Sequence, residues 1–131
     1  MPYFAHADVL ENGPAYVKAN ATKILLISAY TFGDSYATVD AAKLSEAAVT
    51  TANWTWSASG NDRVLTSTDN LTGSVAAASA TGPSNHYAVV DATNSKVLYV
   101  TEEGSDQPIT SGNPVTLKSV VIKATQPTLA V

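Results

Sequence analysis

The sequence predicts a mainly β protein: a β-sandwich or jelly-roll-like single domain with one or two short helices. Runs rich in β-branched and aromatic residues recur at intervals of about eight to twelve residues, a spacing typical of sandwich strands. Clusters of Gly, Pro, Asn, Asp and Ser separate these runs and suit the turns between strands. The chain has 131 residues, enough to bury one core, so we expect one domain over residues 1–131.

The clearest element is a β-hairpin at residues 86–102, within the stretch HYAVVDATNSKVLYVTEE. Two strand-like runs, residues 86–90 and 96–101, are separated by small polar residues that suit a turn. Alternate side chains of a strand lie on opposite faces, and both faces of each run are apolar. In the first run, Ala88 and Val90 are expected on one face and Tyr87 and Val89 on the other. In the second run, Val97 and Tyr99 are expected on one face and Leu98 and Val100 on the other. We therefore expect the hairpin in the middle of a layered domain.

Other strands are expected on both sides of this hairpin. Residues 21–30, ATKILLISAY, are apolar on both faces and should neighbour the hairpin in one sheet. Residues 51–59 form a strand that returns as residues 63–68, and residues 74–80 form a weak one. In the last strand, residues 115–124, the apolar positions change phase, which predicts a bulge or bend near Ser119.

Helical signals are few. Residues 38–49, TVDAAKLSEAAV, combine good helix formers with helical spacing, and Thr38 is a suitable N-cap. We expect this helix to cover one face of a sheet. Residues 8–20 contain Gly13 followed by Pro14, which favours one or two short helical turns.

The low content of charged residues predicts a weakly charged surface. Charged residues make up 14% of the chain, against about 25% in ordinary soluble domains. A surface of Ser, Thr, Asn and Ala is common in proteins that are packed into assemblies, although secreted β-domains share it. The net charge is −4 and Arg63 is the only arginine. With no basic patch for a phosphate backbone, we expect no nucleic-acid partner.

Cysteine is absent, so neither disulfides nor thiolate metal sites are expected. The first residues lack the cationic start and continuous apolar core of a secretion signal. The longest apolar run, residues 24–27, is far shorter than the about 20 residues that span a bilayer. These features favour synthesis in the cytoplasm and no membrane partner.

Residues with catalytic chemistry are sparse. His6 and His86 are the only histidines, and neither lies in a recognisable nucleophile motif. Glu102, Glu103 and Asp106 are suitable ligands for a hard cation but lack the ligand spacing of a calcium loop, so a solvated acidic loop is favoured. The sequence thus predicts a protein that is not an enzyme, with no catalytic residue, cofactor or metal.

Aromatic residues are the best candidates for a binding surface. Trp54 and Trp56 share one face of the strand at residues 51–59, and Tyr87 and Tyr99 lie in the hairpin. Broad rings of this kind anchor contacts with proteins and sugars. Two tryptophans on one strand face are, however, also typical of a core, and this interpretation is the more common outcome.

Several segments together resemble a known family. They are AYVKANATKILLIS, the Ala-rich helix, NDRVLT, NHYAVVDATNSKVLYVTEE and QPITSGNPVTL. In their order they resemble the small structural proteins of tailed-bacteriophage virions of the head-decoration, or capsid cement, type. The resemblance covers most of the chain but departs at the end, where ATQPTLAV replaces an acidic terminus.

The resemblance implies a β-sandwich or jelly-roll body that binds the outside of the shell formed by the major capsid protein. It also implies a small oligomer, a dimer or trimer, and no catalytic residues. The leading hypothesis is therefore a non-enzymatic virion protein that decorates and stabilises the capsid surface of a phage. The alternative is a tail- or fibre-associated module that binds a carbohydrate or receptor through Trp54, Trp56, Tyr87 or Tyr99.

Overall fold

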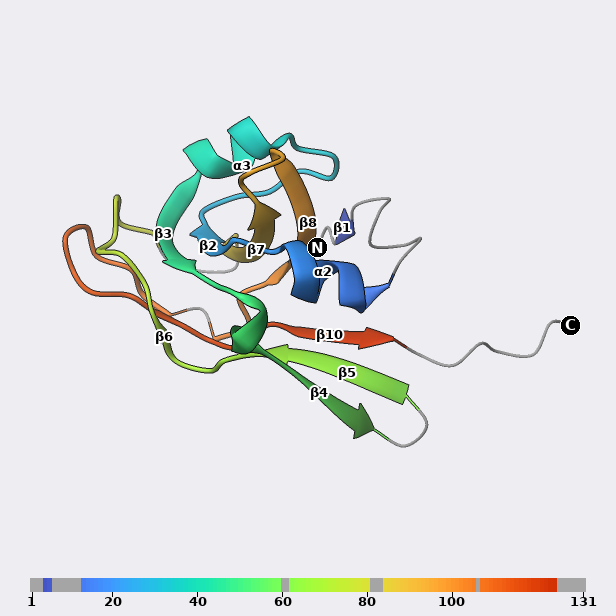
Figure 1. The fold of residues 1–131 in the computed structure, drawn as a ribbon. Helices are drawn as coiled ribbons and strands as arrows, with labels where there is room; N and C mark the ends of the chain where they lie inside the picture. The colour runs from blue at the N-terminus through green and yellow to red at the C-terminus, as the bar shows by residue number, and fades with distance from the viewer. Residues whose placement is uncertain (1–3, 6–12, 60–61, 81–83, 106, 125–131) are drawn as a thin grey trace, which may run out of the picture.

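The computed structural model describes residues 4–5, 13–59, 62–80, 84–105 and 107–124. Of these residues 43% lie in strands and 15% in helices, so the expected mainly β class is confirmed. In this described part the strands form antiparallel sheets of five, three and two strands. Figure 1 shows the five-stranded sheet stacked above the three-stranded one, with the short helices around them. The arrangement is sandwich-like.

The predicted hairpin lies inside the five-stranded sheet, as expected. Its strands are β7 and β8, and β7 also pairs with β2, the strand predicted to neighbour the hairpin. The sheet order is β1-β8-β7-β2-β3. The strands are β1 (Phe4–Ala5), β2 (Lys23–Ile27), β3 (Lys43–Ala48), β7 (His86–Asp91) and β8 (Lys96–Glu102).

Both faces of this sheet are buried, which confirms the expectation of cover on two sides. On one face Ile24, Leu26, Tyr87 and Val89 belong to the main core, which also includes residues of the three-stranded sheet. On the other face lies a second core, covered by the segment that contains Val39. Its strand residues include Leu25, Ile27, Ala88 and Val90. The two central strands thus separate two apolar layers.

A β-bulge changes the faces of β8. Val89 lies opposite Tyr99 and Val90 opposite Val97, so Leu98 is an extra residue on β8. Val97 therefore shares the second core with Val100, while Leu98 belongs to the main core and Tyr99 packs against it. The expected pairing of Val97 with Tyr99 on one face was wrong, because simple alternation takes no account of the extra residue.

The second sheet has three strands in the order β10-β5-β4. They are β4 (Trp54–Ser59), β5 (Asp62–Ser67) and β10 (Val121–Ala124). In Figure 1 the β4–β5 hairpin projects away from the rest of the molecule. The strand expected from residue 51 begins only at Trp54, because a short 3₁₀-helix, η1 (Thr51–Asn53), precedes it.

The last predicted strand divides near Ser119, as the phase change indicated. Its first part, β9 (Thr116–Leu117), pairs with β6 (Leu71–Thr72), and its second part is β10. At the division the Ser119 amide donates to the Asp69 carboxylate at 3.1 Å, and the Val120 amide donates to the Ser67 hydroxyl at 2.7 Å. Side chains thus satisfy the backbone groups where the strand changes sheet.

The helices are short. Helix α2 (Pro14–Asn20) begins with Pro14 in its first turn and lies within the region expected to be helical, of which residues 8–12 fall outside the described part. Helix α3 (Tyr36–Ala41) begins earlier than predicted, with the Ser35 hydroxyl, rather than Thr38, as its N-cap.

The predicted helix over residues 38–49 is wrong beyond Ala41, because residues 43–48 form β3. Ser45 lies opposite Leu26 and Lys43 opposite Ile27, so Leu44 is an extra residue that forms a β-bulge. Because of this bulge, Leu44 and Ala47 both lie in the main core. These two residues are three apart, which in the sequence looks like helical spacing. Helix propensity is worth only tenths of a kcal/mol per residue, whereas burying a leucine contributes about 1.5–3 kcal/mol. Burial therefore decides the structure.

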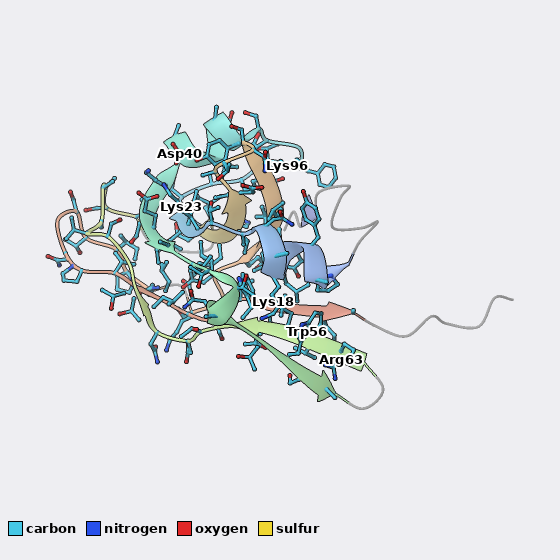
Figure 2. All side chains as sticks on the ribbon, in the orientation of Figure 1. Lys18, Lys23, Asp40, Trp56, Arg63 and Lys96 are labelled. Carbon is cyan, nitrogen blue, oxygen red and sulfur yellow. The ribbon has the colours of Figure 1, made fainter. Side chains whose placement is uncertain are left out.

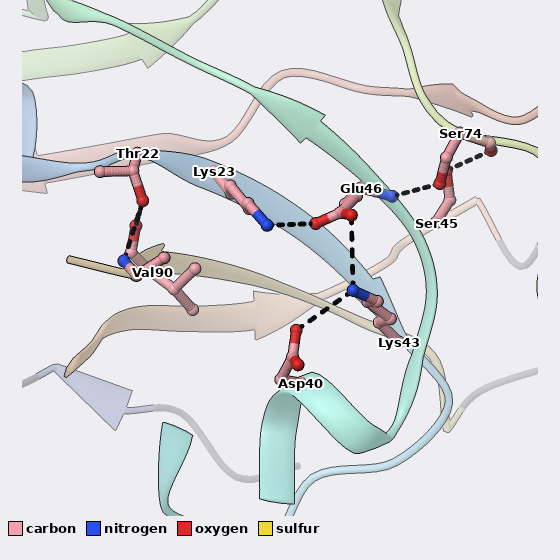
Figure 3. Close-up of polar contacts among 9 residues, drawn as sticks. Thr22, Lys23, Asp40, Lys43, Ser45, Glu46, Ser74 and Val90 are labelled. Carbon is pink, nitrogen blue, oxygen red and sulfur yellow. Dashed lines mark hydrogen bonds and ion pairs between the residues drawn. The ribbon is translucent and has the colours of Figure 1, made fainter. Parts of the chain in front are cut away.

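Residues 74–80 do not form the weak strand that was predicted; within them only Ala80 makes an isolated bridge, to Ile109. Instead, the segment covers the edge of β3. The Ser74 amide donates to the Glu46 carbonyl and the Ala77 amide to the Leu44 carbonyl, each at 2.9 Å. The buried Ser45 hydroxyl donates to the Ser74 carbonyl at 2.6 Å (Figure 3).

Charged side chains connect β2, β3 and α3 at the surface (Figure 3). The Lys23 ammonium lies 2.8 Å from the Glu46 carboxylate, and Lys43 contacts Asp40 at 3.3 Å and Glu46 at 3.4 Å. The hydrogen bond from Lys23 lowers the pKa of Glu46 below its usual value. Because these side chains are partly exposed, each pair contributes at most about 1 kcal/mol.

Gly73 provides a test of the covered β3 edge. A Cβ at this position would overlap the Ser45 hydroxyl and lie 3.2 Å from the Val115 carbonyl oxygen. We predict that Gly73→Ala lowers the free energy of unfolding by about 1–3 kcal/mol, the usual cost of overpacking. Gly104→Ala is the matched control, since a Cβ there meets nothing within 4 Å. Denaturant unfolding of both variants measures the difference, and equal stabilities would contradict this packing.

Candidate interaction surface

The two tryptophans lie on the same face of β4, as predicted, but they differ in exposure. Trp54 is 3% exposed and belongs to the main core, whereas Trp56 is half-buried and packs against its margin. The Arg63 guanidinium lies 5.6 Å from the centre of the Trp56 ring, within the range of a cation–π contact. Figure 2 shows the Trp56 and Arg63 side chains on the projecting hairpin. Of the pair, only Trp56 has a substantial surface within reach of a partner.

The two tyrosines also differ. Tyr87 is 3% exposed, and its hydroxyl accepts a hydrogen bond from the Lys118 amide at 3.0 Å. Burial raises the pKa of Tyr87 above its usual value. Tyr99 is half-buried and packs against the main core. The four aromatic candidates are therefore spread around one core, and they do not form a single exposed platform.

His86 is a buried strand residue, 2% exposed. Its Nδ1 atom lies 2.6 Å from the Ser84 carbonyl oxygen, and Nε2 has no hydrogen-bond partner in the described part of the chain. The ring is 6.2 Å from that of Tyr30. These contacts fix the ring within the core. His6 lies outside the described residues.

The acidic loop was expected to be solvated, and for Glu103 this is wrong. Glu103 is 3% exposed, and its carboxylate accepts hydrogen bonds from the Ser105 amide at 2.8 Å, the Ser105 hydroxyl and the Gln107 amide at 3.1 Å. Its own amide donates to the Asn85 carbonyl. The carboxylate thus organises the turn after β8. Glu102 is half-buried, and Asp106 lies outside the described residues.

A cavity of about 290 Å³ opens beside this loop, lined in part by Tyr87, Glu103 and Lys118. Its polar groups already serve the fold, since Glu103 and Tyr87 both accept backbone hydrogen bonds. Among the described residues, no group of three or more His, Cys, Asp or Glu side chains is placed to hold a metal ion.

A weakly charged surface lies on the solvent side of the three-stranded sheet. We define this outer sheet face by six side chains of β4, β5 and β10 that alternate with buried ones and lie opposite one another in the two ladders. Val121 on this face is 50% exposed, and Lys123 is the charged member of the six. The members are Thr55, Ser57, Val64, Thr66, Val121 and Lys123. Sequence reasoning missed this face because the division of residues 115–124 between two sheets sets its boundary.

Comparison with known proteins adds no relative. No family model, no curated protein and no solved structure matches the chain.

In the described part of the chain, no helix is both long enough and apolar enough to cross a bilayer.

The role of Glu103 is testable. We predict that Glu103→Ala lowers the free energy of unfolding by about 1–3 kcal/mol, because it removes the buried carboxylate that accepts from the Ser105 and Gln107 amides. Glu102→Ala is the control and should have a smaller effect. Thermal unfolding with and without Ca²⁺ is the measurement. If Ca²⁺ stabilises the wild type and Glu103→Ala abolishes that gain, the carboxylate binds a cation and the structural role proposed here is wrong.

Proposed function

We propose that this protein is a non-enzymatic structural component of a tailed-phage virion, which binds the outside of the major capsid protein shell and stabilises it. The observation that carries the proposal is the resemblance, over most of the chain, to head-decoration proteins. Two of its segments contain central strands of the five-stranded sheet: residues 15–28 include all of β2, and residues 85–103 include β7 and β8. The resemblance therefore concerns the body of the fold.

The surface supports the same proposal independently. Only 14% of the residues are charged, and the outer sheet face carries Thr, Ser and Val with a single lysine. Desolvating neutral and apolar surface of this kind costs less free energy than desolvating charged surface, because an unpaired charge loses its hydration when it is buried. A partner shell is thus suited to cover it. Self-association as a dimer or trimer would cover more.

The mechanism would be burial of area repeated over the shell. Each contact needs only modest affinity when several copies or subunits bind together, since linked contacts raise the effective concentration. A protein that spans neighbouring capsid subunits then opposes their separation. No reactive group is required, and the cytoplasm of the infected host would supply both components before assembly.

The alternative, a tail- or fibre-associated module that binds carbohydrate, relies on exposed rings. Trp54 and Tyr87 are each 3% exposed, which leaves only Trp56 and Tyr99 partly accessible. A sugar platform built from all four candidates is therefore not available, and the decoration proposal is better supported.

One experiment on purified virions of the encoding phage tests the proposal. We predict hundreds of copies per particle, retained in washes from low to molar salt, because screening weakens exposed ion pairs but not apolar burial. Quantitative mass spectrometry of the washed particles measures the copy number, with the major capsid protein as internal reference. A handful of copies would favour the tail alternative, and release at high salt would contradict docking through neutral surface.

A further inference from the structure

Strand β4 lies at the edge of the three-stranded sheet, and alternate residues of such a strand point their backbone groups away from it. The Asn53 carbonyl accepts a hydrogen bond from the Thr68 amide at 2.8 Å. Every second residue after Asn53, namely Thr55, Ser57 and Ser59, therefore directs its backbone groups toward β5. Trp54 belongs to the other set, whose backbone groups point away from β5. Its amide donates to the Thr51 carbonyl, and its carbonyl accepts from the Lys18 ammonium at 2.9 Å. Trp56 and Ala58 share the phase of Trp54 and therefore point outward.

The outward groups of Trp56 and Ala58 have no backbone partner in the described part of the chain. Elsewhere the longer edges are protected. The segment from Ser74 covers β3, and the edge of β8 pairs with β1 at Tyr99 and Val100, beside the bulge at Leu98. Strand β10 has only four residues, one of them Lys123, and α2 packs against it. β4 is thus the longest described edge without cover.

Natural proteins usually protect such an edge with lysine, proline or a bulge. The six residues of β4, WTWSAS, contain no charge and no proline, and their ladder with β5 has no bulge. Thr55, Ser57, Ala58 and Ser59 are all exposed. The strand therefore has the chemistry of a pairing surface.

We propose that β4 pairs with β4 of a second copy of this chain, antiparallel, about a two-fold axis at Ser57. This register sets Trp56 opposite Ala58 of the other copy, and the reverse, so that the outward groups of both residues form about four backbone hydrogen bonds. Pairing centred on Trp56 would instead require the Trp54 carbonyl, which Lys18 already occupies. The register at Ser57 uses only backbone groups that have no backbone partner among the described residues.

The side chains and charges of β4 are compatible with its own copy. The large Trp56 ring would neighbour the small Ala58 side chain on one face, and Ser57 would neighbour its symmetry mate on the other. No like charges would be opposed, because the strand has none. The result is one continuous sheet of six strands, three from each copy.

The contact would be modest in size. A stable interface buries about 1,200–2,000 Å², more than one six-residue strand pair supplies. We therefore expect association that rises with concentration in solution and is reinforced when copies lie side by side on a shell. This deepens the self-association in the proposed function. Its test uses the isolated protein, so a failure here is distinguishable from a failure of capsid docking.

Single cysteines in the otherwise cysteine-free chain test the register. Two Ser57 residues on the axis form a non-hydrogen-bonded pair with Cα atoms about 4.5 Å apart, within disulfide range. Two Thr55 residues would be offset by four positions along the strands, about 13 Å. We predict that Ser57→Cys is trapped as a disulfide dimer by a mild oxidant much faster than Thr55→Cys, by non-reducing electrophoresis. Equal rates, or faster trapping of Thr55→Cys, would overturn the proposal.

A charge variant gives a second readout that needs no oxidation. Ser57→Lys would oppose two ammonium groups on the axis, and it should abolish the concentration-dependent rise in sedimentation coefficient. Ala37→Lys adds the same charge at an exposed position of α3 and should leave that rise unchanged. Circular dichroism verifies that both variants are folded. Unchanged association of folded Ser57→Lys would refute the pairing.

Discussion

The structure depends on the burial of both faces of β2 and β7, which pair in the middle of the five-stranded sheet. Each residue from Ile24 to Ile27 is 0% exposed, as are Ala88, Val89 and Val90. Full burial of an aliphatic side chain contributes about 1.5–3 kcal/mol before the entropy of ordering the chain is subtracted. A sheet that is apolar on both faces is unstable in water, so each face requires a layer of its own. The three-stranded sheet supplies one layer, and the segment with α3 supplies the other.

Polar side chains hold the loops onto these layers. Asp91 is buried in the β7–β8 turn, where its carboxylate accepts from the Asn94 amide and side chain. Thr22 accepts from the Ala92 amide at 2.9 Å and so ties the same turn to the start of β2. Glu103 and Tyr87 act likewise after β8 and before β10. Few charges are therefore needed in the interior, and those present satisfy backbone donors.

Much of this arrangement could be predicted from the sequence, because the hairpin and β2 are rich in β-branched, aliphatic and aromatic residues. The errors have local causes. Bulges at Leu44 and Leu98 each insert one residue, which changes the spacing of core residues from two to three. At Leu44 the spacing of three looked helical. At Leu98 it placed Val97 and Tyr99 on opposite faces of β8, where simple alternation had placed them on the same face. Sequence pattern does not show where a ladder gains a residue, because the partner strand decides it.

The candidate surface was less predictable than the fold. The aromatic candidates were chosen for their side-chain chemistry, but their exposure depends on which strand end projects from the body. Trp54 lies where β4 meets the core, and Trp56, two residues on, lies at its margin. Glu103 could not be distinguished from Glu102 because its burial follows from the turn that its own carboxylate organises. The edge of β4 became visible only when the sheet order was known.

The central pair β2 and β7 supplies the core of the molecule's stability, whereas the edge of β4 stays open for contacts. Native-state amide hydrogen exchange tests this division most directly, because it measures the opening free energy of each backbone amide. In dilute protein, the amides of β2 and β7 should exchange slowest, at the free energy of global unfolding, and the outward amides of Trp56 and Ala58 should exchange fastest among strand residues. Exchange of the β7 amides as fast as those of Trp56 and Ala58 would contradict the account.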